Sequence, residues 1–514
     1  MDWTSGYLAD IDYTHGYYRE LAPSLIDFAL LLSGHEPPDR TGMRYLELGY
    51  GQGVSANIHA AAAPGEFWGA DFNPTHAANA QSLARSAGSH AHFSDDSFAD
   101  FLNRQDTPSF DYIALHGVWS WVSDDNRRAI VEIVRRQLNV GGAVYISYNT
   151  LPGWAVSMPL RHLMSLYYAS AGSQTQGIVG RIDASLAFGS RLAEAGARYF
   201  AASPGAKERL DFIAGQNRNY VAHEYFNRHW APMHFSEAHE WLSGAKLGYA
   251  CPADALDQMD VINLTSAQQE VMKELQHQVL SETVRDFFLN QAFRRDIYTR
   301  GARRLSGLQR VERFKALAVV MTSAVEDISF EVEGGLGKVR LKPQIYRPII
   351  EALADGAEPK RVGDLPRRPE LAEFSQASLM EALAVLVGAG WAAPAQSEAD
   401  TEAARPRCRA LNAQLIERAR AAGFSGVLAS PVTGSGVPVG RLEQLFLGAR
   451  SRGKAAPADW AAEAWSILAR QNEAIIKDGA VLPTAEANLA ELSAQASAFA
   501  DKRLPLLQRL LVVD

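Results

Sequence analysis

An alternation of strand-like and helix-like segments between residues 43 and 148 is the feature that most constrains the fold. Strand-like runs lie at 43–48, 66–72, 90–93, 111–115 and 143–148, and helix-like segments lie at 55–63, 74–87 and 124–137. A strand–helix–strand rhythm of this kind predicts a parallel sheet with helices on both faces, which is an α/β fold. Two later runs, near 246–251 and 296–299, would bring a Rossmann-like sheet to seven strands.

The rest of the chain lacks this rhythm and predicts additional regions. Residues 156–222 lose the strand signal, and we expect them to form a helical insertion over the ligand-binding edge of the sheet. Residues 301–400 mix short strands with helices and indicate a winged-helix-like domain, with 396–404 as an exposed linker or wing loop. Residues 401–514 are rich in alanine and predict a mostly helical domain, so the α/β domain is expected to span 1–300.

Charge and cysteine content narrow the classes of partner. Fifty Lys and Arg residues against 58 Asp and Glu residues give a net charge of −8, which argues against nucleic-acid binding. No uncharged apolar stretch reaches the length of about 18 residues that a membrane span requires, and no signal peptide is visible. The two cysteines are too few for a disulfide framework, so we expect a cytoplasmic protein that acts on small molecules or proteins.

A glycine-rich segment follows the first predicted strand and precedes a helix. Its glycines are Gly49, Gly51 and Gly53, and Glu47 stands two residues before the first of them. Glycine permits positive φ angles and lets the backbone approach a ligand closely, although such a loop can also be a plain turn. Asp71 ends the second predicted strand, where a carboxylate can accept hydrogen bonds from both ribose hydroxyls.

The acid at the start of this loop favours one cofactor over another. Glu47 would repel a pyrophosphate, which makes NAD the weaker choice. S-adenosylmethionine (SAM) carries an ammonium, a sulfonium and a free ribose but no phosphate. The segment therefore predicts SAM binding.

The run from Glu47 to Gly53, together with Asp71 and the Asp95-Asp96-Ser97-Phe98 segment, resembles motifs of class I SAM-dependent methyltransferases. The resemblance implies that Asp96 binds the adenine amine and that Phe98 packs on the ring, with Asp95 as the near rival of Asp96. The alternative is that this acidic segment only caps a helix that begins at Phe98. The same resemblance implies a seven-stranded methyltransferase sheet.

Longer blocks resemble one bacterial subgroup of these enzymes. The blocks at 12–18, 115–122 and 148–154 are similar to methyltransferases that carry a "methyltransferase regulatory domain", and the stretch from 223 to 295 resembles that regulatory domain. The subgroup is similar to protein-lysine methyltransferases that act on outer-membrane proteins. From the residues alone we expect the regulatory segment, at about 222–300, to supply strands 6 and 7 and to pack as part of the catalytic domain.

The acceptor side of the predicted sheet lies where strands 4 and 5 end. The candidate catalytic residues there are His116, Trp119, Tyr148 and Asn149. Trp119, Trp121 and Trp154 could form a cage for a methylated ammonium, or could be core residues. Tyr148 and Asn149 could orient an amine, or could simply end the strand.

Two other groups of side chains have alternative interpretations. Tyr13, His15, Tyr17 and Tyr18 could belong to a lid over the cofactor, or to an amphipathic helix packed through its aromatic residues. His223 and Glu224 suggest a metal site, but adjacent residues point in different directions and no third ligand follows at a suitable spacing. We therefore expect no metal.

The leading hypothesis is SAM-dependent methyl transfer to a protein side chain, with lysine as the acceptor. The length of the C-terminal half favours a large substrate. A small-molecule or glycan O-methyltransferase is the first alternative and would need a base such as His116 near the methyl group. A non-catalytic SAM-binding module is the second alternative.

Overall fold

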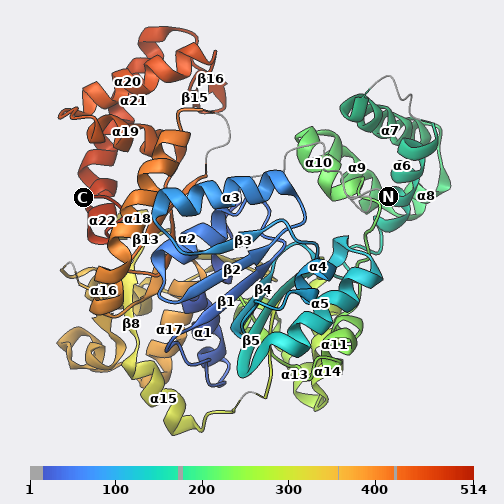
Figure 1. Cartoon of the computed structure of the whole chain (residues 1–514), viewed down its shortest axis with the longest axis horizontal. Coiled ribbons are helices and arrows are strands. Elements are labelled where there is room, and N and C mark those ends of the chain that lie inside the picture. The colour runs from blue at the N-terminus through green and yellow to red at the C-terminus, as the bar shows by residue number, and fades with distance from the viewer. Residues whose placement is uncertain (1–15, 172–176, 302, 357, 422–424) are drawn as a thin grey trace.

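A seven-stranded sheet forms the centre of the molecule (Figure 1). The computed structural model describes residues 16–171, 177–301, 303–356, 358–421 and 425–514. The strands run in the order β3-β2-β1-β4-β5-β7-β6, with β7 antiparallel to its two neighbours and the other pairs parallel. Their bounds are β1 Arg44–Leu48, β2 Glu66–Ala70, β3 His92–Ser94, β4 Phe110–Leu115, β5 Leu138–Asn149, β6 Gly248–Pro252 and β7 Phe293–Thr299. The predicted α/β class and the seven-stranded sheet are confirmed.

Helices cover both faces of the sheet because alternate strand residues are apolar on each side. On β1, Tyr45 packs with α1 (Pro23–Leu32) and α2 (Val54–Ala62) on one face. Leu46 and Leu48 pack on the other face with α4 (Phe98–Asn103), α5 (Asp124–Gln137) and α11 (Phe235–Ser243). Helix α3 (Pro74–Ala87) follows β2 and packs beside α2 and β3. The strand ends that bear the candidate site are therefore held by cores on both faces.

The strand β7 joins the sheet through a buried ion cluster as well as through its backbone. The Arg294 guanidinium lies 2.6 Å from Asp286, 2.9 Å from Asp296 and 2.9 Å from Glu282. The Tyr148 hydroxyl on β5 donates a hydrogen bond to Asp296 at 2.8 Å. Asp286 and Glu282 belong to α14 (Gln278–Leu289), which precedes β7. The cluster thus fastens the segment around 278–299 to the parallel part of the sheet.

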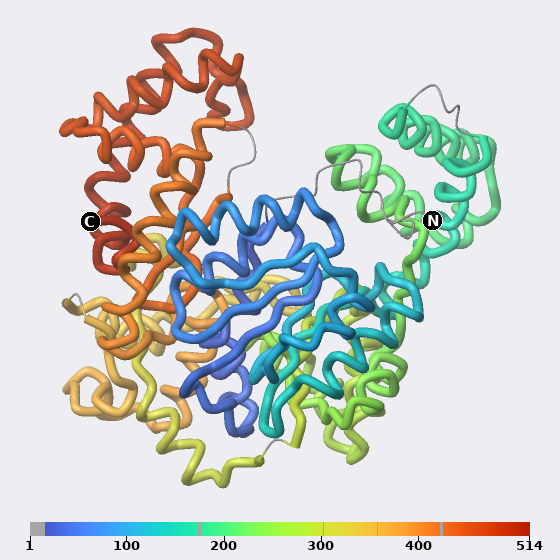
Figure 2. The backbone as a smooth tube through the Cα atoms, in the orientation of Figure 1, coloured from blue at the N-terminus to red at the C-terminus, as the bar shows by residue number. Residues whose placement is uncertain are grey.

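Between β5 and β6 the chain forms a separate helical lobe with its own core, drawn in green in Figure 2. Its helices are α6 (Met158–Ser170), α7 (Gly177–Glu194), α8 (Arg198–Ala202), α9 (Pro204–Ala214) and α10 (Arg218–Tyr225). The core includes Leu160, Leu186, Leu210 and Tyr225 from four of these helices. Short helices α12 (Asp260–Asn263) and α13 (Ser266–Glu274) follow β6. The last turn of α10 faces the carboxyl edge of the sheet through residues that line a cavity described below.

Residues beyond β7 form two further groups of elements. The first contains a three-stranded sheet, a hairpin and three helices: β8 Ala318–Met321, β11 Lys360–Arg361, β12 Ala392–Ala395, β9 Glu331–Gly334, β10 Gly337–Arg340, α15 Gly307–Ala316, α16 Pro343–Ala354 and α17 Gln376–Gly388. The second consists mainly of helices with two small hairpins: α18 Glu398–Arg418, β13 Val427–Ser430, β14 Ser435–Pro438, α19 Arg441–Ser451, α20 Pro457–Arg470, β15 Ile476–Lys477, β16 Ala480–Val481, α21 Ala485–Ala498 and α22 Leu504–Arg509. The winged helix and the domain boundaries stay predictions.

The expectation of a linker or wing loop at 396–404 is wrong, because most of this stretch is the first part of a helix. The Ser397 side chain accepts a hydrogen bond from the Asp400 backbone and caps α18, which begins at Glu398. Ala404 and Cys408 are buried against α2, and the Gln396 amide donates to the Ala62 carbonyl at 2.8 Å. The alanine content that suggested a linker is that of a well-packed helix.

Within the described segments, no helix combines the length and apolar character needed to cross a bilayer.

Replacing Arg294 with methionine is expected to lower the free energy of unfolding by about 3–5 kcal/mol, because three carboxylates lose their buried partner. Carboxyls left unpaired in the fold have raised pKa values, so the folded state holds protons that the unfolded state releases. Stability then falls as pH rises, and the loss should be larger at pH 8 than at pH 5. Thermal or urea unfolding at both pH values measures it. The exposed Arg128→Met variant is the control, and equal losses in the two variants would contradict the prediction.

Candidate functional site

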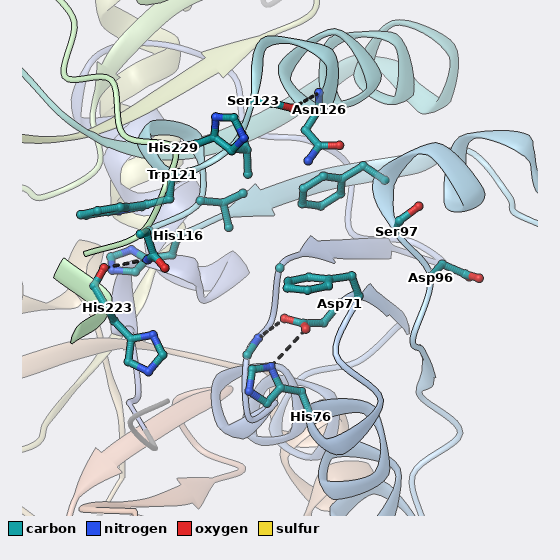
Figure 3. A pocket seen from close by; sticks show the side chains of 18 of the residues that line it. Asp71, His76, Asp96, Ser97, His116, Trp121, Ser123, Asn126, His223 and His229 are labelled. Atoms are coloured by element: carbon teal, nitrogen blue, oxygen red, sulfur yellow. Dashed lines mark hydrogen bonds and ion pairs between the residues drawn. The ribbon is translucent and has the colours of Figure 1, made fainter. Parts of the chain in front are cut away.

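A cavity of about 340 Å³ lies at the carboxyl ends of β1, β2 and β4, where ligands bind in open α/β sheets (Figure 3). Loops after the strands and the last turn of α10 enclose it. The lining residues are Gly49, Gly51, Asp71, Phe72, His76, Asp96, Ser97, Phe98, Ala99, His116, Gly117, Val118, Trp121, Val122, Ser123, Asn126, His223, Glu224, Asn227 and His229. Regions that lie far apart along the chain, from the glycine loop to the segment around α10, thus share one cavity.

The glycine loop has the backbone shape that requires glycine. Gly49, Gly51 and Gly53 all have positive φ angles, and Gly53 leads directly into α2. A Cβ atom on Gly49 would lie 2.5 Å from a methyl group of Val118, on the loop after β4. Gly49 and Gly51 line the cavity, whereas Gly53 packs against Ala80 of α3. The first two glycines expose backbone to a ligand, and the third lets two helices approach.

Asp71 joins this loop to the end of β2. Its Oδ2 accepts a hydrogen bond from the Gly51 backbone N–H at 2.9 Å, and its Oδ1 accepts one from Asn73 at 3.0 Å. The Nδ1 atom of His76 lies 3.1 Å from Oδ1 (Figure 3). The carboxylate is buried and lines the cavity, so its orientation is set before a ligand binds. A carboxylate in this position can accept hydrogen bonds from a diol.

The segment after β3 contributes two of its three predicted cofactor-binding residues, and Ser97 in addition. Asp96, Ser97 and Phe98 line the cavity, but Asp95 does not. Ser97 caps α4 by accepting a hydrogen bond from Asp100, so the capping that the sequence also allowed involves the serine. Asp96 forms an ion pair with Arg104 at 2.9 Å.

Glu47 lies outside the cavity lining. Its side chain is only 4% exposed, and Tyr45 donates a hydrogen bond to it at 3.4 Å. Burial, with a smaller contribution from the nearby charge of Asp71, raises the pKa of Glu47 to about 8. A direct contact between this carboxyl and a ligand would therefore require a rearrangement.

His116 is the candidate catalytic residue that does line the cavity. Tyr18 stacks on its ring with centroids 3.7 Å apart, and its Nδ1 atom lies 2.8 Å from the Tyr145 hydroxyl. Burial lowers the pKa of His116 to about 3, with a smaller contribution from Arg295. The imidazole is therefore neutral near pH 7 and has little tendency to take up a proton.

The structure corrects the predicted roles of Trp119 and Tyr148. Trp119 is fully buried and donates a hydrogen bond from its indole to the Met233 sulfur. Tyr148 is 1% exposed and directs its hydroxyl to Asp296, within the ion cluster of β7. Neither lines the cavity, and neither does Asn149, whose Oδ1 accepts a hydrogen bond from Trp230 at 3.3 Å. Sequence reasoning placed these residues at free strand ends, whereas β7 and the segment around Trp230 cover them.

The predicted cage of Trp119, Trp121 and Trp154 does not form. Trp121 and Trp154 instead flank Trp230, with ring centroids 6.2 Å and 5.0 Å from it. The Arg161 guanidinium lies over the Trp230 ring at 4.3 Å and near the Trp121 ring at 5.8 Å. An internal cation thus already faces these aromatic rings.

The sequence analysis expected a helical insertion over this edge of the sheet but assigned none of its residues to the site. His223, Glu224, Asn227 and His229 line the cavity, and none of them was among the predicted site residues. No local pattern predicts this, because helices α6 to α9 all lie between these residues and β5 along the chain. Across the described ranges, no group of three or more His, Cys, Asp or Glu side chains is placed to bind a metal ion.

The proposed lid is described only in part. Tyr13 and His15 lie outside the described residues. The Tyr17 hydroxyl accepts a hydrogen bond from the Gly436 backbone at 2.6 Å and lies 3.2 Å from His59. Tyr18 reaches the cavity through its stacking on His116. These two tyrosines therefore face different partners.

The charges of the lining residues fit SAM. Asp71, Asp96 and Glu224 are acidic, and no lysine or arginine is present among the described residues that line the cavity. Such a site suits a ligand with positive charges and disfavours one with phosphates. The glycine loop offers backbone groups, and Phe72 and Phe98 offer apolar surface for a base.

Two family models match the chain, and both agree with this site. A model described as a methyltransferase domain matches residues 46–142, and one described as a predicted methyltransferase regulatory domain matches residues 217–300. The first match contains the glycine loop, Asp71 and Asp96, and the second contains α10 and β7. Fold, cavity and family models together define a class I SAM-dependent methyltransferase with SAM as its cofactor.

The family membership follows from one relative that matches over the full length. The chain is 38% identical over 513 residues to the uncharacterized protein sll1526 of Synechocystis sp., covering 99% of both chains, and it belongs to that family. It is also 28% identical over 297 residues to the uncharacterized protein RP789 of Rickettsia prowazekii, covering 55% of this chain and 51% of that protein.

Solved structures with the same overall fold include PKMT2 from Rickettsia typhi. Its complex with AdoHcy has a TM-score of 0.67 at 18% sequence identity, covering 98% of this chain and 100% of that one. A second structure of PKMT2 has a TM-score of 0.65 at 16% identity, covering 97% and 98%. The similarity includes the regions beyond the sheet, so the whole arrangement of elements recurs.

Replacing Asp71 with asparagine is expected to weaken SAM binding about tenfold or more, because a charge-assisted contact is lost and the amide must set an N–H group against a backbone donor. Calorimetric titration measures the affinity, and thermal unfolding checks that the fold persists. The exposed Asp125→Asn variant is the control. Equal affinity in the wild type and both variants would refute the assignment of Asp71.

Proposed function

We propose that this chain transfers the methyl group of SAM to a protein side chain, and that the acceptor atom is a lysine amine. The observation that carries this proposal is the cavity itself, where three carboxylates and no described lysine or arginine meet around an apolar wall. A cavity of this kind suits a cationic cofactor beside a cationic acceptor. Similarity in fold to PKMT2, a protein lysine methyltransferase by its name, supports a protein acceptor.

The proposed cofactor contacts follow from the residues that line the cavity. Asp71 accepts hydrogen bonds from the ribose hydroxyls, and the backbone at Gly49 and Gly51 approaches the methionine part. Asp96 binds the adenine amine and Phe98 packs on the ring. The exclusion of Asp95 from the lining favours Asp96 in this role. Glu47 and Gly53 support the loop from behind.

Bound SAM supplies an electrophilic methyl group on a sulfonium. The chain's own task is to hold a neutral amine in line with that methyl carbon and to exclude water. A lysine ammonium has a pKa near 10.4, so the site must also accept a proton before the nitrogen can attack. His116 is a poor candidate for that step because burial lowers its pKa to about 3.

The same property of His116 weakens the alternative of small-molecule or glycan O-methylation, which would need a strong base at this position. The non-catalytic module remains an outcome of the test below. We further propose a cytoplasmic location, supported by two buried cysteines that are not paired with each other. The acidic net charge supports a protein partner over nucleic acid.

We also propose the division of the chain that the sequence suggested. Residues 1–300 would form the catalytic domain with the insertion at about 156–222, residues 301–400 a winged-helix-like domain, and residues 401–514 a mostly helical domain. The antiparallel insertion of β7 between β5 and β6 supports a catalytic domain that includes the regulatory segment.

The full chain, incubated with methyl-labelled SAM and a bacterial protein extract, is expected to transfer label to protein. Acid hydrolysis and amino-acid chromatography of the labelled protein should then recover the label as N-methylated lysine. The Asp71→Asn variant should transfer much less at a SAM concentration near the wild-type dissociation constant.

Label found only in small molecules would overturn the protein acceptor and favour the O-methyltransferase alternative. Label in protein but in another residue would overturn lysine alone. SAM binding without any transfer would favour the non-catalytic module.

A further inference from the structure

Helix α10 contributes a carboxylate to the cavity wall, and the proposed cofactor contacts give this carboxylate no role. Glu224 lines the cavity together with His223, Asn227 and His229, all from the segment that the regulatory-domain model matches. The glycine loop and Asp71 come instead from the segment that the methyltransferase model matches. Cofactor residues and α10 residues therefore meet across one space.

Among the described residues, Glu224 has no hydrogen bond and no ion pair. Two guanidiniums influence it electrostatically, Arg209 and Arg161. Both instead lie over aromatic rings: Arg209 is 4.7 Å from the ring of Trp154, and Arg161 is 4.3 Å from the ring of Trp230. A carboxylate on a cavity wall without a partner is left available to a ligand.

Burial raises the pKa of Glu224 to about 7, and the two arginines oppose that shift. The group therefore exchanges its proton close to neutral pH. Glu224 combines this pKa with a position on the cavity lining. A base poised in this way is what an ammonium acceptor requires.

Contacts with α6 hold this wall in place. Arg161 donates a hydrogen bond to the Asn227 carbonyl at 2.9 Å, and Ser165 donates one to the Tyr225 carbonyl at 3.0 Å. The Asn227 amide donates to the His223 carbonyl at 2.7 Å and closes the end of α10. The backbone on both sides of Glu224 is thus fixed relative to the lobe.

The cavity that Glu224 lines suits an alkyl chain that ends in a positive charge. Val118, Trp121 and Val122 line the same cavity and provide apolar surface. Such surface suits the methylene stem of a lysine, with the carboxylate at its end. A neutral alcohol would gain much less from this arrangement, because it carries no charge to pair with the carboxylate.

We infer that Glu224 forms the acceptor subsite, where it pairs with the alkylammonium of the incoming side chain and takes its proton. This inference rests on the proposed function. The proton moves from the ammonium nitrogen to a Glu224 oxygen and leaves a neutral amine. The nitrogen lone pair then forms the N–C bond to the methyl carbon while the C–S bond breaks, and its electron pair stays on the sulfur. The charge lost by the sulfonium reappears on the methylated ammonium.

The test compares Glu224→Gln, which keeps the shape and removes the charge, with Glu208→Gln. Glu208 is exposed on the neighbouring helix α9 and lies outside the cavity lining. Two readouts besides turnover apply. Calorimetry gives the affinity for SAM, and saturation-transfer NMR on the protein loaded with S-adenosylhomocysteine gives binding of Nα-acetyl-lysine-methylamide, with the norleucine analogue as the uncharged probe.

In Glu224→Gln we expect SAM affinity within about twofold of wild type and binding of the lysine probe weaker by about tenfold or more. Binding of the norleucine probe should be unchanged, and transfer of label to lysine should fall at least in proportion. Glu208→Gln should match the wild type in every readout. Thermal unfolding confirms that both variants fold.

Wild-type transfer to lysine together with unchanged probe binding and transfer in Glu224→Gln would overturn this inference and leave the proposed function standing. A large loss of SAM affinity would assign Glu224 to the cofactor and overturn the acceptor role. Absence of transfer to lysine in the wild type would overturn both proposals.

Discussion

The pairing of β7 with β5 is the constraint on which the rest of the site depends. The two strands pair antiparallel from Ala143 with Thr299 to Asn149 with Phe293, and β6 adds to the far side of β7. The chain must therefore leave β5 at the carboxyl edge and return to pair with it only after the helical lobe, β6 and α14. The segment between β5 and β7 therefore begins and ends at the carboxyl edge of the sheet, where the cofactor cavity lies. The buried ion cluster around Arg294 holds β7 in this position. The segment called regulatory by its family model is consequently part of the catalytic fold, and its α10 has access to the cavity.

The electrostatics of the cavity follow from where each charge is neutralised. Asp71 directs its oxygens to the Gly51 and Asn73 backbone and to His76, which orders the loop. Arg161 and Arg209 lie over tryptophan rings outside the cavity lining, and the imidazole of His116 stays neutral. The space is left with net negative character at its cofactor end and at its α10 end. A positively charged donor and a positively charged acceptor would otherwise repel each other, so carboxylates at both ends make their joint binding more favourable.

Much of the fold could be predicted from the sequence because its signals are local. Apolar runs between turn residues predicted the strands, and the three glycines with Asp71 predicted where a ligand approaches. The failures have a common origin in contacts between distant segments. Trp119 follows β4 and Tyr148 lies near the end of β5, but the side chains of Met233 and Asp296 contact them in the fold. Glu224 reaches the cavity only because the helical lobe folds back over the sheet. The linker expected at 396–404 failed for a different reason, since alanine content alone does not separate an exposed segment from a helix packed on α2.

The regions beyond the sheet also contribute to the cavity, through a short path in the N-terminal segment. Tyr17 is held by the Gly436 backbone of β14, and the Tyr18 backbone donates a hydrogen bond to Ser55 of α2 at 3.0 Å. The Tyr18 ring then stacks on His116 at the cavity wall. Because adjacent residues share one backbone, the position of Tyr18 over His116 depends on the anchoring of Tyr17 against a strand of the C-terminal half.

Helix α18 of the C-terminal half packs on both α2 and α3. These two helices follow the glycine loop and Asp71, so that half of the chain supports the segments that present the glycine loop and Asp71. The C-terminal half therefore belongs to the structural support of the active site.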